Sequence, residues 1–338
     1  MKKALRLLGF AALAVVVLVG AAVAYLSAKP PAQRPASTET IARTPERIAR
    51  GRYLVEHVTD CLTCHSEVNG DRYGSPVSEG TAGKGGFPFT KDFEVPGVVC
   101  AQNITPDPET GLGNWTDGEI LRAFREGIDR QGNALFPMMP YQGYRTLSDE
   151  DAKAIVAYLR TLPPLKNKVP AKHIDFPVNL FIKAVPKPLD GPVTAPDDDK
   201  DHMGYGRYLV TISGCGECHT AHDAKGKLVP GRDFAGGWVM KGPWGRVVTA
   251  NITPHPDTFM GKATKEEFIG RFKAFESLQG DNAPLAQKGH NTIMPWLAFA
   301  GMTEKDLGAI YDYIKTVKPI ENKVEPFPDA APVPAAKS

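Results

Sequence analysis

Two short cysteine motifs constrain this chain more than any other feature of its sequence. They are Cys-Leu-Thr-Cys-His at residues 61–65 and Cys-Gly-Glu-Cys-His at residues 215–219. Cys-x-x-Cys-His is typical of covalent haem c attachment, in which two thiols form thioethers with the porphyrin and the histidine ligates the iron. We therefore predict two covalently attached haem c groups. The predicted thioether residues are Cys61, Cys64, Cys215 and Cys218, and the predicted iron ligands are His65 and His219.

Paired cysteines also occur in zinc sites and in redox-active dithiols. A zinc site needs two further ligands at ordered spacing, and the sequence offers none beside these pairs. Four of the five cysteines fall inside the two pentapeptides, each of which is closed by one of only eight histidines. The haem interpretation is therefore favoured over both alternatives.

A long uncharged run follows the basic N-terminus. Residues Leu7–Leu26 contain no charged side chain, and as a helix this run would be about 30 Å long, enough to cross a bilayer. The preceding Lys2, Lys3 and Arg6 predict a cytoplasmic N-terminus, which places the rest of the chain on the periplasmic side of the inner membrane. The alternative is a signal peptide cleaved after the small residues 22–24, but the run is longer than is usual for signal peptides.

The charge of the chain indicates protein partners. The formal net charge is +2, and it becomes −1 when the three basic residues of the N-terminal segment are left out. Without a basic patch, no nucleic-acid partner is expected.

The motifs lie within an internal repeat. Gly-Arg-Tyr-Leu-Val occurs at residues 51–55 and again at 206–210, a displacement of 155 residues, which indicates one module used twice. Helix caps recur in both copies. They are Thr116 with Glu119 and Thr264 with Glu267 for a middle helix, and Ser148 with Asp151 and Thr303 with Asp306 for a last helix. Helix, haem motif, long loop, middle helix, loop and last helix is the plan of a cytochrome c domain.

We therefore predict an all-α fold of two tandem cytochrome c domains, each wrapped around one haem, after an N-terminal membrane helix. The expected parts are a membrane anchor or uncleaved signal (1–26), a flexible tether (27–45), domain 1 (46–163), a proline-rich linker (164–203), domain 2 (204–323) and a disordered tail (324–338). Within the linker, residues 173–182 are expected to pack across both modules, with a membrane-surface or partner-binding role as the alternative. The acidic run at 197–201 is most simply a solvated turn, with docking as the alternative.

The repeat also indicates the second iron ligands. Met139 and Met294 both precede a proline and are separated by the same 155 residues, whereas Met138 aligns with Ile293. Methionine opposite histidine raises the potential of a haem, although most methionines are core filler. His57 and His290 are alternative ligands.

Cys100 is the odd cysteine. It aligns with Val248, so we interpret it as a small buried hydrophobe. The alternative is a thiolate iron ligand, as in diheme thiosulfate-oxidising enzymes.

Asn-Ile-Thr-Pro also occurs twice, at residues 103–106 and 251–254. With the haem motifs and the Met-Pro sites, these repeats resemble the cytochrome c subunits of membrane-bound bacterial alcohol, gluconate and aldehyde dehydrogenases, over about residues 46–323. The resemblance implies that Met139 and Met294 are distal ligands. It also implies a dehydrogenase subunit as electron donor and quinone, an oxidase or another cytochrome as acceptor. Those subunits usually have three haem modules, and this chain has two. The Asn-Ile-Thr-Pro turn itself is either purely structural or places the Asn amide on a haem propionate.

Two hypotheses of function remain. The first is a periplasmic electron carrier with two His/Met haems and no catalytic acid–base residue. The second is a diheme enzyme, such as a peroxidase or thiosulfate dehydrogenase, in which one iron has an open site. Two equivalent Met-Pro sites favour the carrier, because an enzyme needs two different haems.

Overall fold

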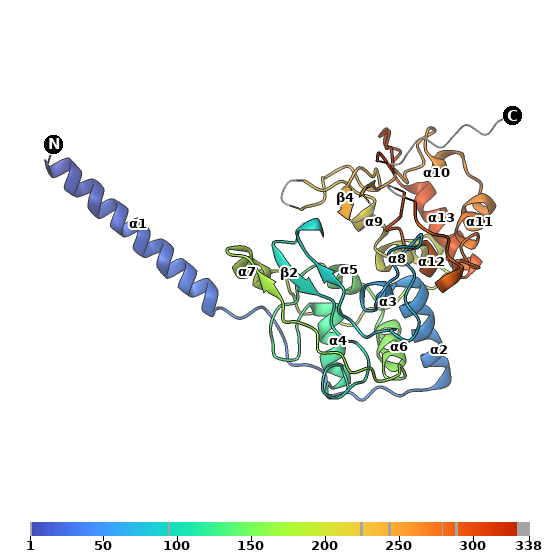
Figure 1. Cartoon of the computed structure of the whole chain (residues 1–338), viewed down its shortest axis with the longest axis horizontal. Helices are drawn as coiled ribbons and strands as arrows, with labels where there is room; N and C mark the ends of the chain where they lie inside the picture. The colour runs from blue at the N-terminus through green and yellow to red at the C-terminus, as the bar shows by residue number, and fades with distance from the viewer. Residues whose placement is uncertain are drawn as a thin grey trace.

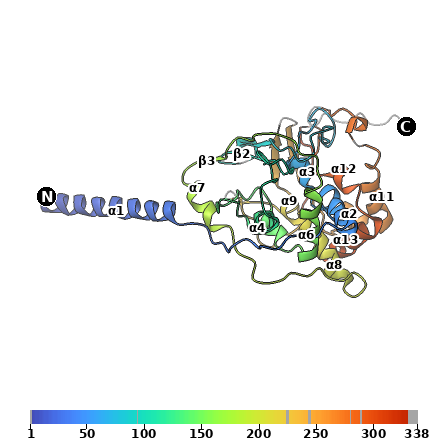
Figure 2. The same cartoon turned by 90° about the horizontal axis from the view of Figure 1, so that it is seen from below.

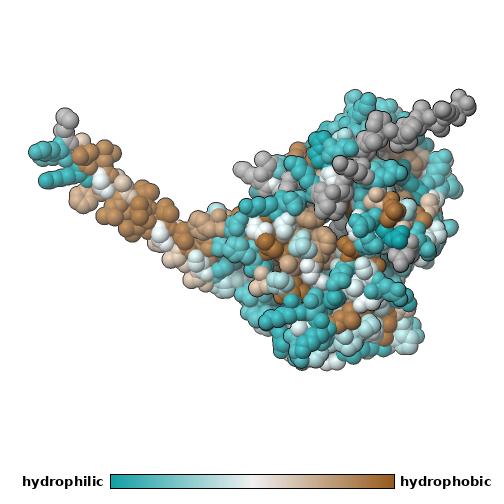
Figure 3. Space-filling model, in the orientation of Figure 1, coloured by the Kyte–Doolittle hydropathy of each residue, from teal (hydrophilic) through white to brown (hydrophobic). Residues whose placement is uncertain are grey.

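The computed structural model describes residues 2–93, 95–223, 226–242, 245–278, 280–287 and 290–329. A long helix, α1 (Lys2–Ala28), projects from a body that contains the rest of the chain (Figure 1). No residue of α1 is buried, and its surface is almost continuously hydrophobic beyond the basic end (Figure 3). Within the described ranges, α1 is the one helix that is long and apolar enough to cross a membrane.

Each half of the body has a helix before the haem motif, a helical turn at the motif, a middle helix and a last helix. The predicted caps are confirmed, with complete capping boxes at Thr116 and Thr264 and side-chain caps at Ser148 and Thr303. The first half contains α2 (Pro45–Tyr53), the π-helix η1 (Leu54–Val58), α3 (Cys61–Cys64), η2 (Lys91–Phe93), α4 (Asp117–Glu126), α5 (Tyr141–Tyr144) and α6 (Asp149–Leu159). The second half contains α8 (His202–Ile212), α9 (Cys215–Cys218), α10 (Phe259–Lys262), α11 (Lys265–Lys273), η4 (Gly280–Asn282), α12 (Trp296–Phe299) and α13 (Glu304–Thr316).

Short strands correct the prediction of an all-α fold. Strands β1 (Pro88–Phe89), β2 (Gly97–Cys100) and β3 (His173–Ile174) form an antiparallel sheet, and β4 (Val239–Gly242) pairs with β5 (Gly245–Val248). These strands lie in the long loops, where backbone groups that leave water need partners. Gly97 permits the pairing with β3, because a Cβ there would lie 2.1 Å from the carbonyl oxygen of His173.

One hydrophobic cluster runs through both halves of the body. It includes Leu54 and Val55 from the first half and Leu209 and Leu307 from the second. The repeated glycine of Gly-Arg-Tyr-Leu-Val allows each helix before the haem motif to contact the last helix of its own half. A Cβ on Gly51 or Gly206 would lie 1.9 Å or 2.3 Å from the carbonyl oxygen of Ala154 or Ala309, respectively.

The segment before α2 is held against the body, in contrast to the flexible tether that we expected. Ile41 is buried, and its backbone N–H donates to the Asp117 carboxylate over 2.9 Å. Arg34 forms a 2.8 Å ion pair with the buried Glu126. Contacts of its apolar and charged side chains therefore hold this proline-rich segment against the body, although the segment has no regular secondary structure.

The linker also packs on the body. Its β3 pairs with β2, and Ile182 in η3 (Ile182–Ala184) joins a second, smaller apolar cluster. Leu180 in α7 (Val178–Phe181) is also buried. We expected residues 173–182 to pack across both modules, whereas these contacts place them against the first half.

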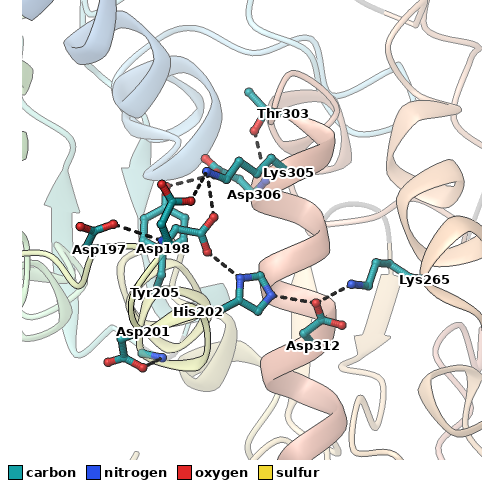
Figure 4. A network of polar contacts seen from close by, with 12 residues as sticks. Asp197, Asp198, Asp201, His202, Tyr205, Lys265, Thr303, Lys305, Asp306 and Asp312 are labelled. Carbon is teal, nitrogen blue, oxygen red and sulfur yellow. Dashed lines mark hydrogen bonds and ion pairs between the residues drawn. The ribbon is translucent and has the colours of Figure 1, made fainter.

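The acidic run is more than a solvated turn. Asp198 is largely buried and pairs with His202 and Lys305, and His202 also bonds Asp312 of α13 (Figure 4). The end of the linker is thus attached to the second half.

The start of the predicted disordered tail is ordered. The N–H of Val248 donates to the carbonyl of Pro326 over 2.9 Å, and Arg246 pairs with Asp329 at 2.6 Å. The expected disorder is therefore wrong for residues 324–329, while residues 330–338 lie outside the described part of the chain.

Candidate haem sites

Each haem motif forms a single helical turn after a left-handed residue. Asp60 (φ 45°, ψ 48°) precedes α3, and Gly214 (φ 69°, ψ 20°) precedes α9. Residues three apart share one face of a helix, so the two cysteines of each motif lie on one side of their turn. Asp60 also accepts a 2.7 Å hydrogen bond from the Thr63 hydroxyl. This placement suits two thioethers to one macrocycle.

The two motif histidines have matching hydrogen bonds. Nδ1 of His65 bonds the carbonyl oxygen of Gln102 at 2.6 Å, and Nδ1 of His219 bonds that of Ala250 at 2.7 Å. Because a carbonyl only accepts, Nδ1 carries the proton and the lone pair is on Nε2. Burial lowers the pKa of both imidazoles, which favours the neutral form that ligates metals. Both histidines therefore fit the role of axial haem ligand.

Burial raises the pKa of all four motif thiols. Cys64 and Cys218 are exposed to solvent, yet burial among protein atoms is the main cause that raises their pKa to about 12 and about 11. The charge of Cys218 also contributes to the raised pKa of Cys64, so the two motifs lie close to each other.

The two candidate distal methionines have matching surroundings. Met139 and Met294 directly precede the prolines at the N-caps of α5 and α12. Both are partly buried against the same large cluster as Cys61 and Cys215. Met138 instead packs against the smaller cluster beneath the first-half sheet. This difference favours Met139 over its neighbour.

The alternative ligands have other partners. Nδ1 of His57 bonds the carbonyl oxygen of Ala298 at 3.0 Å, and the ring of His290 lies against those of Tyr73 and Phe327. Cys100 ends β2 and is buried, as expected for a small hydrophobe.

The Asn-Ile-Thr-Pro repeats form two matching hydrogen-bond networks, which we call the Asn–Thr locks. In the first, Asn103 Nδ2 donates to the carbonyl oxygen of Leu165 (2.7 Å) and to Thr110 Oγ1 (3.1 Å). Its Oδ1 accepts from the N–H and the hydroxyl of Thr105 (2.9 and 2.7 Å). The second lock joins Asn251 to Thr253, Ile320 and Asn322 in the same way.

The Asn–Thr locks bear on the two interpretations of the Asn-Ile-Thr-Pro turn, a structural turn or a contact with a haem propionate. Both amide hydrogens of each asparagine are used within the protein, so the structural interpretation is favoured over a bond to a haem propionate. The residue directly before each asparagine, Gln102 or Ala250, supplies the carbonyl that bonds the motif histidine. Sequence reasoning missed these two carbonyls, whose only signal is their position before a repeated asparagine.

A pair of crossed hydrogen bonds joins the two halves. Tyr53 of the first half donates to Asp306 of α13 over 2.6 Å, and Tyr208 of the second half donates to Asp151 of α6 over 2.6 Å. Each tyrosine oxygen also accepts the N–H of a helix cap in the other half, from Thr303 or Ser148. Both tyrosines come from the repeated Gly-Arg-Tyr-Leu-Val.

Comparisons with known proteins agree with this geometry. The family model named Cytochrome c matches residues 48–163. A protein of Cereibacter sphaeroides named "Diheme cytochrome c-type" is 30% identical over 324 residues, which cover 92% of this chain and 98% of that protein. The chain belongs to the cytochrome c family. Members of this family carry covalently bound haem c, and the residues just described fit that group.

This cytochrome c also resembles subunits of larger assemblies. The cytochrome c subunit of alcohol dehydrogenase (quinone) from Gluconobacter oxydans is 30% identical over 67% of this chain and 46% of that subunit. The fructose dehydrogenase cytochrome subunit of Gluconobacter japonicus is 29% identical over 80% of this chain and 52% of that subunit. The chain therefore spans about half the length of these two dehydrogenase subunits.

Proposed function

We propose that this chain is a membrane-anchored, periplasmic diheme cytochrome c. In this proposal it carries electrons from a partner dehydrogenase toward the respiratory chain, where quinone, an oxidase or another cytochrome is the acceptor. The observation that carries the proposal is the matched pair of sites, each with a carbonyl-oriented histidine and a methionine packed on the same core cluster. Two alike, saturated irons suit electron transfer, because neither leaves a position for substrate.

The domain organisation is part of this proposal. Residues 1–26 form the anchor, and residues 46–163 and 204–323 form two tandem haem domains. The repeated helix caps, the repeated glycine contacts and the reciprocal Tyr–Asp bonds support two related units. The names of the dehydrogenase subunits support a dehydrogenase as the donor.

The residues of this chain have defined roles in the proposal. When bound, haem c supplies one-electron redox chemistry. Cys61 and Cys64, like Cys215 and Cys218, would hold the group covalently. The Gln102 and Ala250 carbonyls orient the histidines that would bind the iron, and Met139 and Met294 would supply its second ligands. The closeness of Cys64 to Cys218 supports exchange of electrons between the two sites.

The ligand assignment is tested by replacing Met139 or Met294 with alanine. Each substitution is expected to lower the midpoint potential of one haem by a sizeable part of the range of about 0.8 V that axial ligands span. Redox titration with visible spectroscopy measures the shift, and Met138→Ala is the matched control. If Met138→Ala moves a potential and Met139→Ala does not, the assignment is wrong.

A second measurement separates the carrier from an enzyme. The native reduced protein is expected not to bind carbon monoxide, because both irons are saturated. Binding at one haem would instead indicate an open site and a haem enzyme.

The partner is tested by mild detergent isolation of the tagged chain, where a copurifying dehydrogenase whose substrate reduces both haems is expected.

A further inference from the structure

The linker helix α7 lies beside the end of α1. Both views place it at the side of the body that faces α1 (Figure 1, Figure 2), and the two helices are in contact. Nζ of Lys183, two residues after α7, donates to the carbonyl oxygen of Ser27 in the last turn of α1 over 2.7 Å. The position of this part of the body relative to the end of α1 is therefore defined.

Residues 176–183, which we call the α7 segment, have two apolar faces. Leu180 and Ile182 are buried against the body. Phe176 and Phe181 point the other way, with exposures of 66% and 59%. Two large aromatic side chains exposed within one short segment leave apolar area in water, which is typical of an interaction surface.

The side chains around the end of α1 mark the level of the α7 segment. Tyr25 lies in the last two turns of α1, and Nζ of Lys29 lies 5.8 Å from the centre of its ring. Tyrosine and lysine at the end of a membrane span are typical of the lipid headgroup region. Ser27, the partner of Lys183, lies between them, so the α7 segment is at the same level.

The charges nearby suit a lipid surface. Lys183 lies two residues after Phe181, Lys29 directly follows α1, and both can attract anionic headgroups. The acidic neighbour Asp175 lies 3.4 Å from Nε2 of His173. The combination of exposed aromatic and basic side chains is typical of segments that lie in a membrane interface.

We propose that the α7 segment inserts Phe176 and Phe181 into the outer interface of the membrane that α1 spans. The inference rests on the membrane anchor of the proposed function. It adds a second contact beside the helix, which fixes the tilt of the first haem-binding half relative to the bilayer. A single helix followed by a tether would leave that tilt free.

Site-directed spin labelling of the full-length, haem-loaded chain tests this inference. The protein is placed in vesicles of phosphatidylcholine and phosphatidylglycerol, with one nitroxide on Phe181→Cys, on Val16→Cys within α1 or on Leu285→Cys. Leu285 is 72% exposed in the second half and serves as the water control. Collision rates with oxygen, which enters lipid, and with a water-soluble nickel chelate are measured by EPR. The unmodified chain, whose Cys100 is buried, is the labelling blank.

The expected oxygen-to-nickel ratio at residue 181 is severalfold higher than at residue 285 and approaches that at residue 16. Adding Phe176→Ser to the residue 181 label is expected to lower the ratio. If residue 181 matches residue 285 while residue 16 stays in lipid, the inference is wrong and the anchor stands. If residue 16 is itself open to the nickel chelate, the anchor fails and the inference fails with it.

Discussion

His202 is held between two carboxylates. Its Nδ1 lies 2.6 Å from Asp198 and its Nε2 lies 2.8 Å from Asp312 (Figure 4). Because carboxylates accept, both ring nitrogens donate, which is the protonated form. These hydrogen bonds, that to Asp312 first, raise the pKa of His202. Lys305 and Lys265 pair with the same two carboxylates, and burial of the imidazole partly opposes the rise in its pKa.

This arrangement predicts a pH-dependent stability. A raised folded-state pKa stabilises the protein fully below the unfolded pKa of about 6.5, and the stabilisation is lost as pH rises through the folded pKa. His202→Gln is therefore expected to remove part of the fall in the free energy of unfolding between about pH 6 and pH 8. The side chain is 41% exposed, so the effect should stay below about 1 kcal/mol.

Urea denaturation at several pH values measures this effect. His173→Gln is the matched control, because His173 is an exposed histidine that also lies near a carboxylate, Asp175. The control is expected to retain the slope of the parent protein. A His202→Gln variant with the same slope would contradict the prediction.

At the motif residues, spacing alone was enough for a specific prediction, because the chemistry of Cys-x-x-Cys-His depends on adjacent positions. It did not predict that Asp60 is left-handed. The signal was in the second copy, where Gly214 stands at the matching position, since glycine adopts this conformation without steric cost.

Among the elements, the Asn–Thr locks connect each histidine-bonding carbonyl to the segment that follows the last helix. Asn103→Ala removes two donors and the acceptor of Thr105 from a buried turn. We expect the free energy of unfolding to fall by about 1–3 kcal/mol, because buried polar groups are left without hydrogen-bond partners. The potential of the first haem should shift as well, because the Gln102 carbonyl is released.

The matched control is Asn114→Ala. Asn114 is exposed, and its amide bonds one carbonyl, that of Pro108, so the change should stay within about 0.5 kcal/mol. Chemical denaturation and redox titration of both variants provide the comparison. If both variants lose the same free energy of unfolding, or if the potential of the first haem is unchanged in Asn103→Ala, then Asn103 does not position the Gln102 carbonyl.

The helices were predictable because caps and apolar periodicity are local signals. Strands β1 to β5 were not, because these strands lie in loops and, for β3, in the linker. Their residues show no alternating pattern, since burial there follows from tertiary contact.

At the scale of the whole molecule, the crossed Tyr–Asp bonds hold the two halves together. Tyr53→Phe and Tyr208→Phe are each expected to lower the free energy of unfolding by about 1–3 kcal/mol, because a hydrogen bond to a buried carboxylate is lost. In the double variant, the halves should unfold in two separate calorimetric transitions.

Tyr311→Phe is the control for this experiment. Tyr311 bonds the carbonyl of Ala263 within the second half, so its loss should leave unfolding as cooperative as in the parent protein. A double variant with one transition at an unchanged midpoint would show that the halves are held together by other contacts.

The sequence by itself was enough to predict the cofactor, the four thiols, the two histidines and the duplication, because these predictions depend on residues close together in the chain. Only the tertiary structure decided where the proline-rich segments lie and that Met139 packs with the haem-motif cluster while Met138 packs with the other. It also decided that the repeated tyrosines bond across the halves rather than within them. These outcomes depend on contacts between residues far apart in the chain, and no local spacing encodes such contacts.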